Sequence, residues 1–112
     1  MPDVTTGRTP AYSITEVVEV LDPEGAQRYA ELTPITVDKF GGRFVVQGGL
    51  PTAAEGEAGV AVAVVAWPDM ETLLAWYDSP EYAPAREIAA TAMRRRLIFL
   101  PGIAATARPD DQ

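Results

Sequence analysis

The chain has 112 residues, of which 47% are hydrophobic and 22% are charged, and this length and composition are typical of one globular domain. The formal net charge of -7 at pH 7 argues against a DNA- or RNA-binding protein, because phosphate binding requires a basic surface. The absence of cysteine and histidine excludes disulfides, thiolate nucleophiles, zinc sites built from those residues, histidine-ligated haem and Ser-His-Asp triads within the chain.

The first predicted element is a strand at residues 12–21, after a polar and aperiodic segment, residues 1–9, that we expect to form a flexible tail. The strand is rich in β-branched residues that mostly alternate with polar ones. Val17 and Val18 interrupt this alternation, which predicts a slip or bulge. The side chains that share one face of the strand are those of Tyr12, Ile14 and Glu16.

A helix is predicted to begin after Asp22, because Pro23 suits the first helical position and Glu24 suits the first turn. Apolar side chains then recur at helical spacing as far as about Phe40. Pro34 lies inside this helix and removes one backbone hydrogen bond, which predicts a kink or a short break. A glycine pair directly after Phe40 ends the helix.

Two strands are predicted next, separated by a loop at residues 50–58 that we expect to be exposed. The first of them, residues 43–47, is short and is closed by a glycine pair. Residues 60–67 are apolar at every position. In a strand this pattern indicates that both faces are covered, so we expect the strand in the middle of the sheet.

The second helical region is predicted to be split by a corner. Residues 68–69 open one helix, which is expected to end near Tyr77. A second start signal follows at once, because Ser79 is a suitable N-cap, Pro80 suits the first helical position and Glu81 suits the first turn.

The helix that begins at residue 80 is predicted to run to about Met93. The basic run 94–96 is interpreted as its solvated last turn rather than as a phosphate site, because cations suit the negative end of the helix dipole. Residues 97–100 form the last predicted strand, and residues 104–112 are expected to be a second flexible tail. A single domain therefore spans residues 10–103.

The predicted order of strand, helix, strand, strand, helix, strand is that of the ferredoxin-like α+β fold, a four-stranded antiparallel sheet with helices on one face. The helices cover only one face, yet the strand at residues 60–67 is apolar on both. We therefore expect the open face to be buried in a homodimer. No apolar run approaches the ~20 residues needed to cross a bilayer, and a cytoplasmic protein without membrane or nucleic-acid partners is expected.

The stretch 76–86 is the predicted functional surface, because aromatic rings and charged groups are concentrated there. Tyr82 and Arg86 are four residues apart on a predicted helix, so their side chains can reach one pocket. Arg86 either clamps a carboxylate or an enolate, or it holds the helix corner by pairing with an acidic neighbour. The acidic neighbours available for such a pair are Asp78, Glu81 and Glu87.

Glu16 is a third candidate catalytic residue with two alternative roles. If its face of the sheet lines the pocket, desolvation raises its pKa and it serves as a general base. If that face is the dimer side, Glu16 pairs with an arginine. The residues expected to contact a substrate, with core or interface packing as the alternative for the aromatic ones, are Tyr12, Arg43, Trp67, Trp76 and Tyr77.

The chain resembles the small bacterial proteins known as domain of unknown function 1330, within the dimeric α+β barrel superfamily. The resemblance covers roughly residues 12–102. The matching residues, at the family's spacing, are Asp22-Pro23, Tyr29, Pro34, Phe40-Gly41-Gly42-Arg43, Gly48-Gly49, Trp67-Pro68, Ala75 to Tyr82, and Arg86. Where relatives often carry a basic residue before the second glycine pair, this chain has Gln47.

The resemblance implies the ferredoxin-like fold and a dimer, and it implies no shared reaction. Superfamily relatives include cofactor-free monooxygenases, cyclases, haem enzymes and simple binding proteins. We expect a cofactor-independent enzyme, with no metal or haem, that acts on a small aromatic or polyketide-like metabolite by acid/base-assisted cyclisation, isomerisation or oxygenation. The alternative is a non-catalytic dimer that binds a small ligand or a partner protein.

Overall fold

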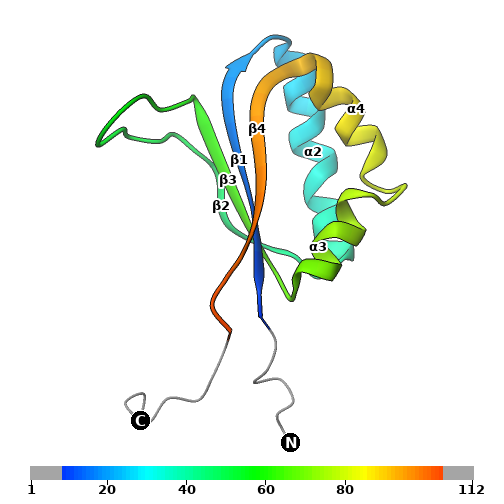
Figure 1. Cartoon of the computed structure of the whole chain (residues 1–112). Coiled ribbons are helices and arrows are strands. Elements are labelled where there is room, and N and C mark those ends of the chain that lie inside the picture. The colour runs from blue at the N-terminus through cyan, green and yellow to red at the C-terminus, as the bar shows by residue number, and fades with distance from the viewer. Residues whose placement is uncertain (1–8, 105–112) are drawn as a thin grey trace, which may run out of the picture.

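The computed structural model describes residues 9–104, which form one four-stranded antiparallel sheet with three helices on one face (Figure 1). In chain order the elements are β1 (Ala11–Val20), α2 (Pro23–Lys39), β2 (Arg43–Gly49), β3 (Ala61–Trp67), α3 (Met70–Tyr77), α4 (Ala83–Ala92) and β4 (Met93–Pro101). The strands lie in the order β2-β3-β1-β4. This arrangement confirms the ferredoxin-like α+β fold, with β3 inside the sheet as predicted.

Most of the two predicted tails, residues 1–8 and 105–112, lies outside the described residues. No helix within residues 9–104 combines the length and apolar character needed to cross a membrane. The loop between β2 and β3 projects away from the sheet on the side opposite the helices (Figure 1).

The register of β1 divides the side chains between the two faces of the sheet. Ser13 pairs with Val65 of β3, and both are buried on the helical face. Ile14 pairs with Ile98 of β4 on the other face, where Ile98 remains 53% exposed. The register against β4 shifts after Val17, which confirms the predicted bulge.

A stack of three buried aromatic rings forms the core beneath the helices. The ring centroid of Trp76 lies 4.9 Å from that of Trp67 and 4.0 Å from that of Tyr82. The Trp67 indole donates to the Ser13 hydroxyl at 3.0 Å, and the Trp76 indole donates to the Thr36 hydroxyl at 2.9 Å. Their N–H groups are therefore satisfied inside the protein, and the rings can be buried without an unpaired donor.

Helix α2 runs without a break across Pro34, so the short break predicted beside this residue is absent. The helix ends at Lys39, and Gly41 shortly after it has a φ of 81°, the left-handed conformation that glycine adopts freely and that the prediction assigned to this pair. At the other corner, α3 begins after Asp69, whose carboxylate accepts the Thr72 N–H at 2.7 Å.

The start of α4 differs from the prediction by three residues. The Ser79 hydroxyl accepts the Tyr82 N–H at 3.2 Å, as an N-cap does, but residues 79–82 form a turn and the regular helix begins at Ala83. Ser79 also donates to the Trp76 carbonyl at 2.7 Å, which ties the corner back to α3.

The interpretation of the basic run 94–96 as a helix terminus is wrong. Helix α4 ends at Ala92, and the three arginines belong to β4. Side chains alternate along this strand. Arg94 donates a hydrogen bond to the Glu19 carboxylate at 2.7 Å, while Arg95 points to the helical face and contacts Tyr29. Pairing with neighbouring strand and helix residues offsets the low preference of such a charged run for a strand.

Candidate functional site

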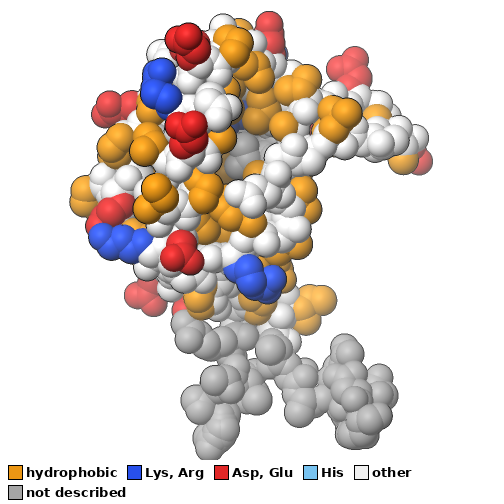
Figure 2. Space-filling view, turned by 180° about the vertical axis from the view of Figure 1, so that it is seen from behind, with side chains coloured by type: hydrophobic (Ala, Val, Ile, Leu, Met, Phe, Trp, Pro, Cys, Tyr) orange, Lys and Arg blue, Asp and Glu red, His pale blue; other side chains and the backbone are white. Residues whose placement is uncertain are grey.

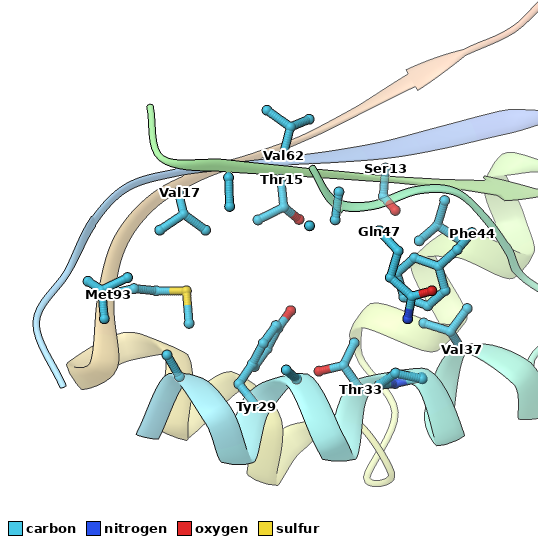
Figure 3. Close-up of a pocket in the computed structure, with 18 of the residues that line it drawn as sticks. Ser13, Thr15, Val17, Tyr29, Thr33, Val37, Phe44, Gln47, Val62 and Met93 are labelled. Carbon is cyan, nitrogen blue, oxygen red and sulfur yellow. The ribbon is translucent and has the colours of Figure 1, made fainter. Parts of the chain in front are cut away.

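A largely apolar cavity of about 280 Å³ lies between α2 and the sheet (Figure 3). Its sheet wall is built from small side chains, including Thr15 of β1 and Ala61 and Ala63 of β3, and these leave space between the helix and the sheet. Met93 lies at one end, and Phe44 and Gln47 of β2 lie at the other (Figure 3). Such a volume suits a small organic ligand rather than a macromolecule.

The surface of the molecule is also hollowed between the helical side and the loop that joins β2 to β3 (Figure 2). Seen from behind, a hollow bordered by hydrophobic side chains separates the helical side from the projecting loop (Figure 2). Charged side chains lie mainly around the helical surface in that view. None of the described residues that line the cavity is charged. A ligand there is therefore recognised by shape and by hydroxyl and amide groups.

Tyr29 supplies the central polar group of the cavity. It stands on α2 with its hydroxyl directed toward the sheet (Figure 3). This oxygen lies 2.6 Å from the Tyr82 hydroxyl, and it accepts an N–H of Arg95 at 2.7 Å. The Arg95 guanidinium also lies over the Tyr29 ring, 4.9 Å from its centroid.

The direction of the tyrosine-tyrosine hydrogen bond follows from the donors and acceptors available. The Tyr82 side chain is completely buried, and its oxygen has only Tyr29 and Arg95 as hydrogen-bond partners among the described residues. Arginine cannot accept a hydrogen bond, so the Tyr82 O–H is satisfied only when it donates to Tyr29. The Tyr29 oxygen then accepts twice, and its own O–H remains available to the cavity.

The environment of Tyr82 keeps it a neutral donor. Burial, followed by the nearby Tyr29, raises the pKa of the Tyr82 hydroxyl well above its ordinary value, and Arg95 only partly offsets this effect. Tyr82 therefore stays protonated across the physiological pH range.

Glu16 lies on the opposite side of the sheet from this cluster. It accepts from Arg96 at 2.6 Å and from the Gly59 N–H at 2.9 Å, so the second of its two alternatives, pairing with an arginine on the open face, is the one observed. The hydrogen bond from Arg96, and then that from Gly59, hold the pKa of Glu16 below its ordinary value. A lowered pKa makes Glu16 a weaker base, and the sheet separates it from the cavity.

Tyr82 and Arg86 do not open into one cavity. Tyr82 points inward to Tyr29, while Arg86 folds back over the Tyr77 ring, 4.2 Å from its centroid, and donates to the Tyr77 carbonyl at 3.3 Å. Among the described residues Arg86 makes no ion pair with the acidic residues of the corner. Arg86 and Tyr77 instead border a separate surface depression on the α4 side, together with Arg95 and Glu87.

The remaining candidates fall into two groups. Tyr12 and Arg43 belong to the open face, where Tyr12 pairs with Leu100 and Arg43 pairs with Ala66. Trp67 is buried in the aromatic stack. Trp76 is also part of that stack, and it lines the cavity as well. Trp76 is thus the candidate that the structure brings to the cavity wall.

The family model described as domain of unknown function (DUF1330) matches residues 10–103. The chain belongs to this family. No curated protein matches the chain. The description of the DUF1330 family names no activity, so membership in it assigns none to this chain.

Solved structures similar to this DUF1330 chain include a protein of unknown function from Rhodopseudomonas palustris, at 20% identity and a TM-score of 0.70, covering 85% of this chain and 83% of that one. A second is a dimeric ferredoxin-like protein of unknown function from Jannaschia sp., at 11% identity and a TM-score of 0.67, covering 81% and 97% of the two chains. A third is SnoaB, a cofactor-independent oxygenase from Streptomyces nogalater, at 11% identity and a TM-score of 0.63, covering 90% and 98%. At these identities the likeness establishes the fold.

Sequence reasoning missed the chemically most distinctive part of this DUF1330 protein, the Tyr29–Arg95 contact. Tyr29 falls on the apolar stripe of α2, which is typical of core packing. Arg95 belongs to the basic run 94–96, which was predicted to be the last turn of a helix. The available signal was the alternation from Met93 to Phe99, which places Arg95 on the helical face.

Proposed function

We propose that this protein is a cofactor-independent enzyme that binds a small aromatic or polyketide-like metabolite in the cavity beneath α2. The Tyr29 O–H donates a hydrogen bond to a substrate oxygen and stabilises the negative charge that develops there during enolisation. The observation that carries this proposal is the double hydrogen bond accepted by the Tyr29 oxygen, from Arg95 at 2.7 Å and from Tyr82 at 2.6 Å.

Two accepted hydrogen bonds polarise the Tyr29 hydroxyl and make its proton a stronger donor. One of the two donors is a guanidinium, which carries a permanent positive charge. A substrate oxygen bound to Tyr29 would lie about 5–6 Å from that charge, where the attraction is about 3 kcal/mol at an effective dielectric constant of about 20, before solvent screening reduces it. Preorganised donors of this kind are a major source of rate enhancement in enzymes.

The apolar lining supports an aromatic or polyketide-like substrate, since flat apolar rings match the side chains around the cavity. The similar structure described as a cofactor-independent oxygenase supports chemistry without a metal or an organic cofactor. Enolisation is the step that cyclisation, isomerisation and oxygenation of such metabolites have in common.

A second function, simple ligand binding, is favoured by one observation. Among the described residues the cavity lining contains no carboxylate, and so no built-in general base faces Tyr29. Under the enzyme hypothesis the proton therefore leaves to water or to a buffer base that enters the cavity. Under the binding hypothesis no proton is transferred.

Exchange of the α-protons of 2-tetralone, a small aromatic ketone, separates the two functions. In deuterated buffer the wild type should accelerate exchange over buffer alone, and Tyr29→Phe should remove most of that acceleration. Tyr77→Phe is the matched control, because Tyr77 lies outside the cavity lining. Binding of the ketone without faster exchange favours the binding protein, and absence of both binding and exchange contradicts the proposal.

The proposal includes a homodimer formed through the open face of the sheet. The apolar side chains of that face are those of Tyr12, Ile14, Val62, Val64, Ile98 and Leu100. Similar ferredoxin-like structures are described as dimeric. A second copy would remove this apolar surface from water, which is the main driving force for such association.

A further inference from the structure

Thr33 is a buried polar residue that the Tyr29 cluster does not use. It is 7% exposed, and among residues 9–104 its hydroxyl oxygen is the one buried side-chain polar atom without a hydrogen-bond partner. An unpaired hydroxyl in an apolar interior is unfavourable, and native proteins rarely leave one without a role. Thr33 lines the cavity, with its hydroxyl beside Tyr29 (Figure 3).

The spacing of the two groups is fixed by α2. Tyr29 and Thr33 are four residues apart, so they lie on one face of the helix with Cβ atoms about 6 Å apart. The same turn contains a second polar group. Pro34 has no N–H, so the Ala30 carbonyl receives no hydrogen bond from residue 34, and both residues line the cavity.

We infer that the ligand carries a second oxygen, which binds the Thr33 hydroxyl while the first binds the Tyr29 O–H. The substrate class is then a small aromatic or fused-ring compound with at least two phenolic, keto or enolic oxygens. This inference rests on the proposed function and adds a second contact to it. It also excludes a carboxylate or phosphate at the second position, because no charged side chain among the described residues lines the cavity.

A ligand O–H at this position can donate to the Thr33 oxygen, and a ligand carbonyl can accept from the Thr33 O–H. The site therefore accepts a ligand hydroxyl or a ligand keto group. A hydrocarbon edge at the same position leaves the Thr33 hydroxyl unpaired, and such a ligand binds less tightly.

The test compares 2-naphthol with 1,3-dihydroxynaphthalene and 2,7-dihydroxynaphthalene, which add a second hydroxyl at two different spacings. Affinities are measured by the quenching of naphthol fluorescence, with the full chain of the wild type, Thr33→Val and Thr33→Ser. At least one diol should bind the wild type about fivefold to tenfold more tightly than 2-naphthol, as expected for one additional hydrogen bond. That advantage should disappear in Thr33→Val and persist in Thr33→Ser.

Stability supplies a second readout. Since Thr33→Val replaces an unpaired buried hydroxyl with a methyl group, the ligand-free variant should be as stable as the wild type or more stable. A clear loss of stability, or a diol advantage that survives in Thr33→Val, overturns the inference. Equal binding of 2-naphthol and both diols to the wild type also overturns it, but leaves the proposed function intact. Failure of all three naphthols to bind counts against the proposed function itself.

Discussion

The hydroxyl oxygens of Tyr29 and Tyr82, 53 residues apart in the sequence, lie 2.6 Å from each other beneath α2. Tyr82 is fully buried and has no acceptor other than Tyr29 among the described residues, so its O–H donates to Tyr29. The contact links the corner before α4 to the cavity. It also sets the orientation of the Tyr29 O–H, on which the proposed chemistry depends.

Tyr82→Phe should lower the free energy of unfolding by about 1 kcal/mol at neutral pH, because one buried hydrogen bond is lost. The variant should also respond differently to alkali. The native state holds the pKa of Tyr82 above its ordinary value, whereas the unfolded chain releases that proton above about pH 10. Wild-type stability is therefore fully present below about pH 10 and declines as the pH rises further.

Urea unfolding at several pH values between about 8 and about 11 checks this expectation. The alkaline decline should be shallower for Tyr82→Phe than for the wild type, because the variant lacks this proton. Parallel pH profiles for the two proteins would show that Tyr82 is not the buried donor described above.

Arg95→Met should slow 2-tetralone exchange about tenfold or more, because the charged donor behind Tyr29 is lost. It should also lower stability by about 1–2 kcal/mol, because two hydrogen bonds and a cation–π contact disappear. Arg94→Met is the matched control on the same strand. Its exposed ion pair with Glu19 should change stability by about 0.5 kcal/mol or less and leave exchange unaffected. Equal effects of the two substitutions on exchange would refute a specific role for Arg95.

Arg86→Ala should lower the melting temperature by about 4–8 °C, which corresponds to about 1 kcal/mol for a domain of this size. The reason is the loss of the contact with the Tyr77 ring and carbonyl. Affinity for 2-naphthol should not change, since Arg86 does not line the cavity. Arg28→Ala, on the exposed surface of α2, is the control for removing an arginine. Loss of affinity without loss of stability would contradict this expectation and indicate that Arg86 contacts the ligand.

Ile98→Asp should convert the proposed dimer into a monomer, because it places a charge on the apolar open face opposite Ile14. The wild type should be dimeric at micromolar concentration, and its melting temperature should rise with protein concentration. Ile35→Asp is the control, because Ile35 is 69% exposed on α2, on the helical side of the sheet. Light scattering measures the mass of each protein. A wild type that is monomeric and folded at these concentrations would contradict the predicted interface.

The strand order and the bulge were predictable because they depend on local patterns. The uniform apolar run of β3 and the Val17-Val18 pair are visible in the sequence, and each maps directly onto sheet geometry. The corner before α4 was predictable in kind, since Ser79 caps its turn, but the regular helix starts later than the proline signal suggested.

The candidate site was harder to predict, because it depends on contacts between distant segments. Tyr29 and Thr33 have the spacing of core residues on a helix, and only the small side chains opposite them, such as Ala63, turn that core position into a cavity. Arg95 became interpretable only once the strand register placed it against Tyr29. Glu16 illustrates the same limit, because the choice between its two roles depended on which face of the sheet the helices cover.

We propose above that Tyr29, with Arg95 behind it, stabilises negative charge on a ligand oxygen. Absorbance titration of 2-naphthol bound to the wild type and to Tyr29→Phe tests it directly, because naphthol and naphtholate absorb differently. The pKa of 2-naphthol bound to the wild type should lie below its value in water. The pKa of 2-naphthol bound to Tyr29→Phe should lie above its value in water, since an apolar cavity alone disfavours the anion. A bound pKa that is unchanged or raised in the wild type, or equal in the two proteins, would contradict the account.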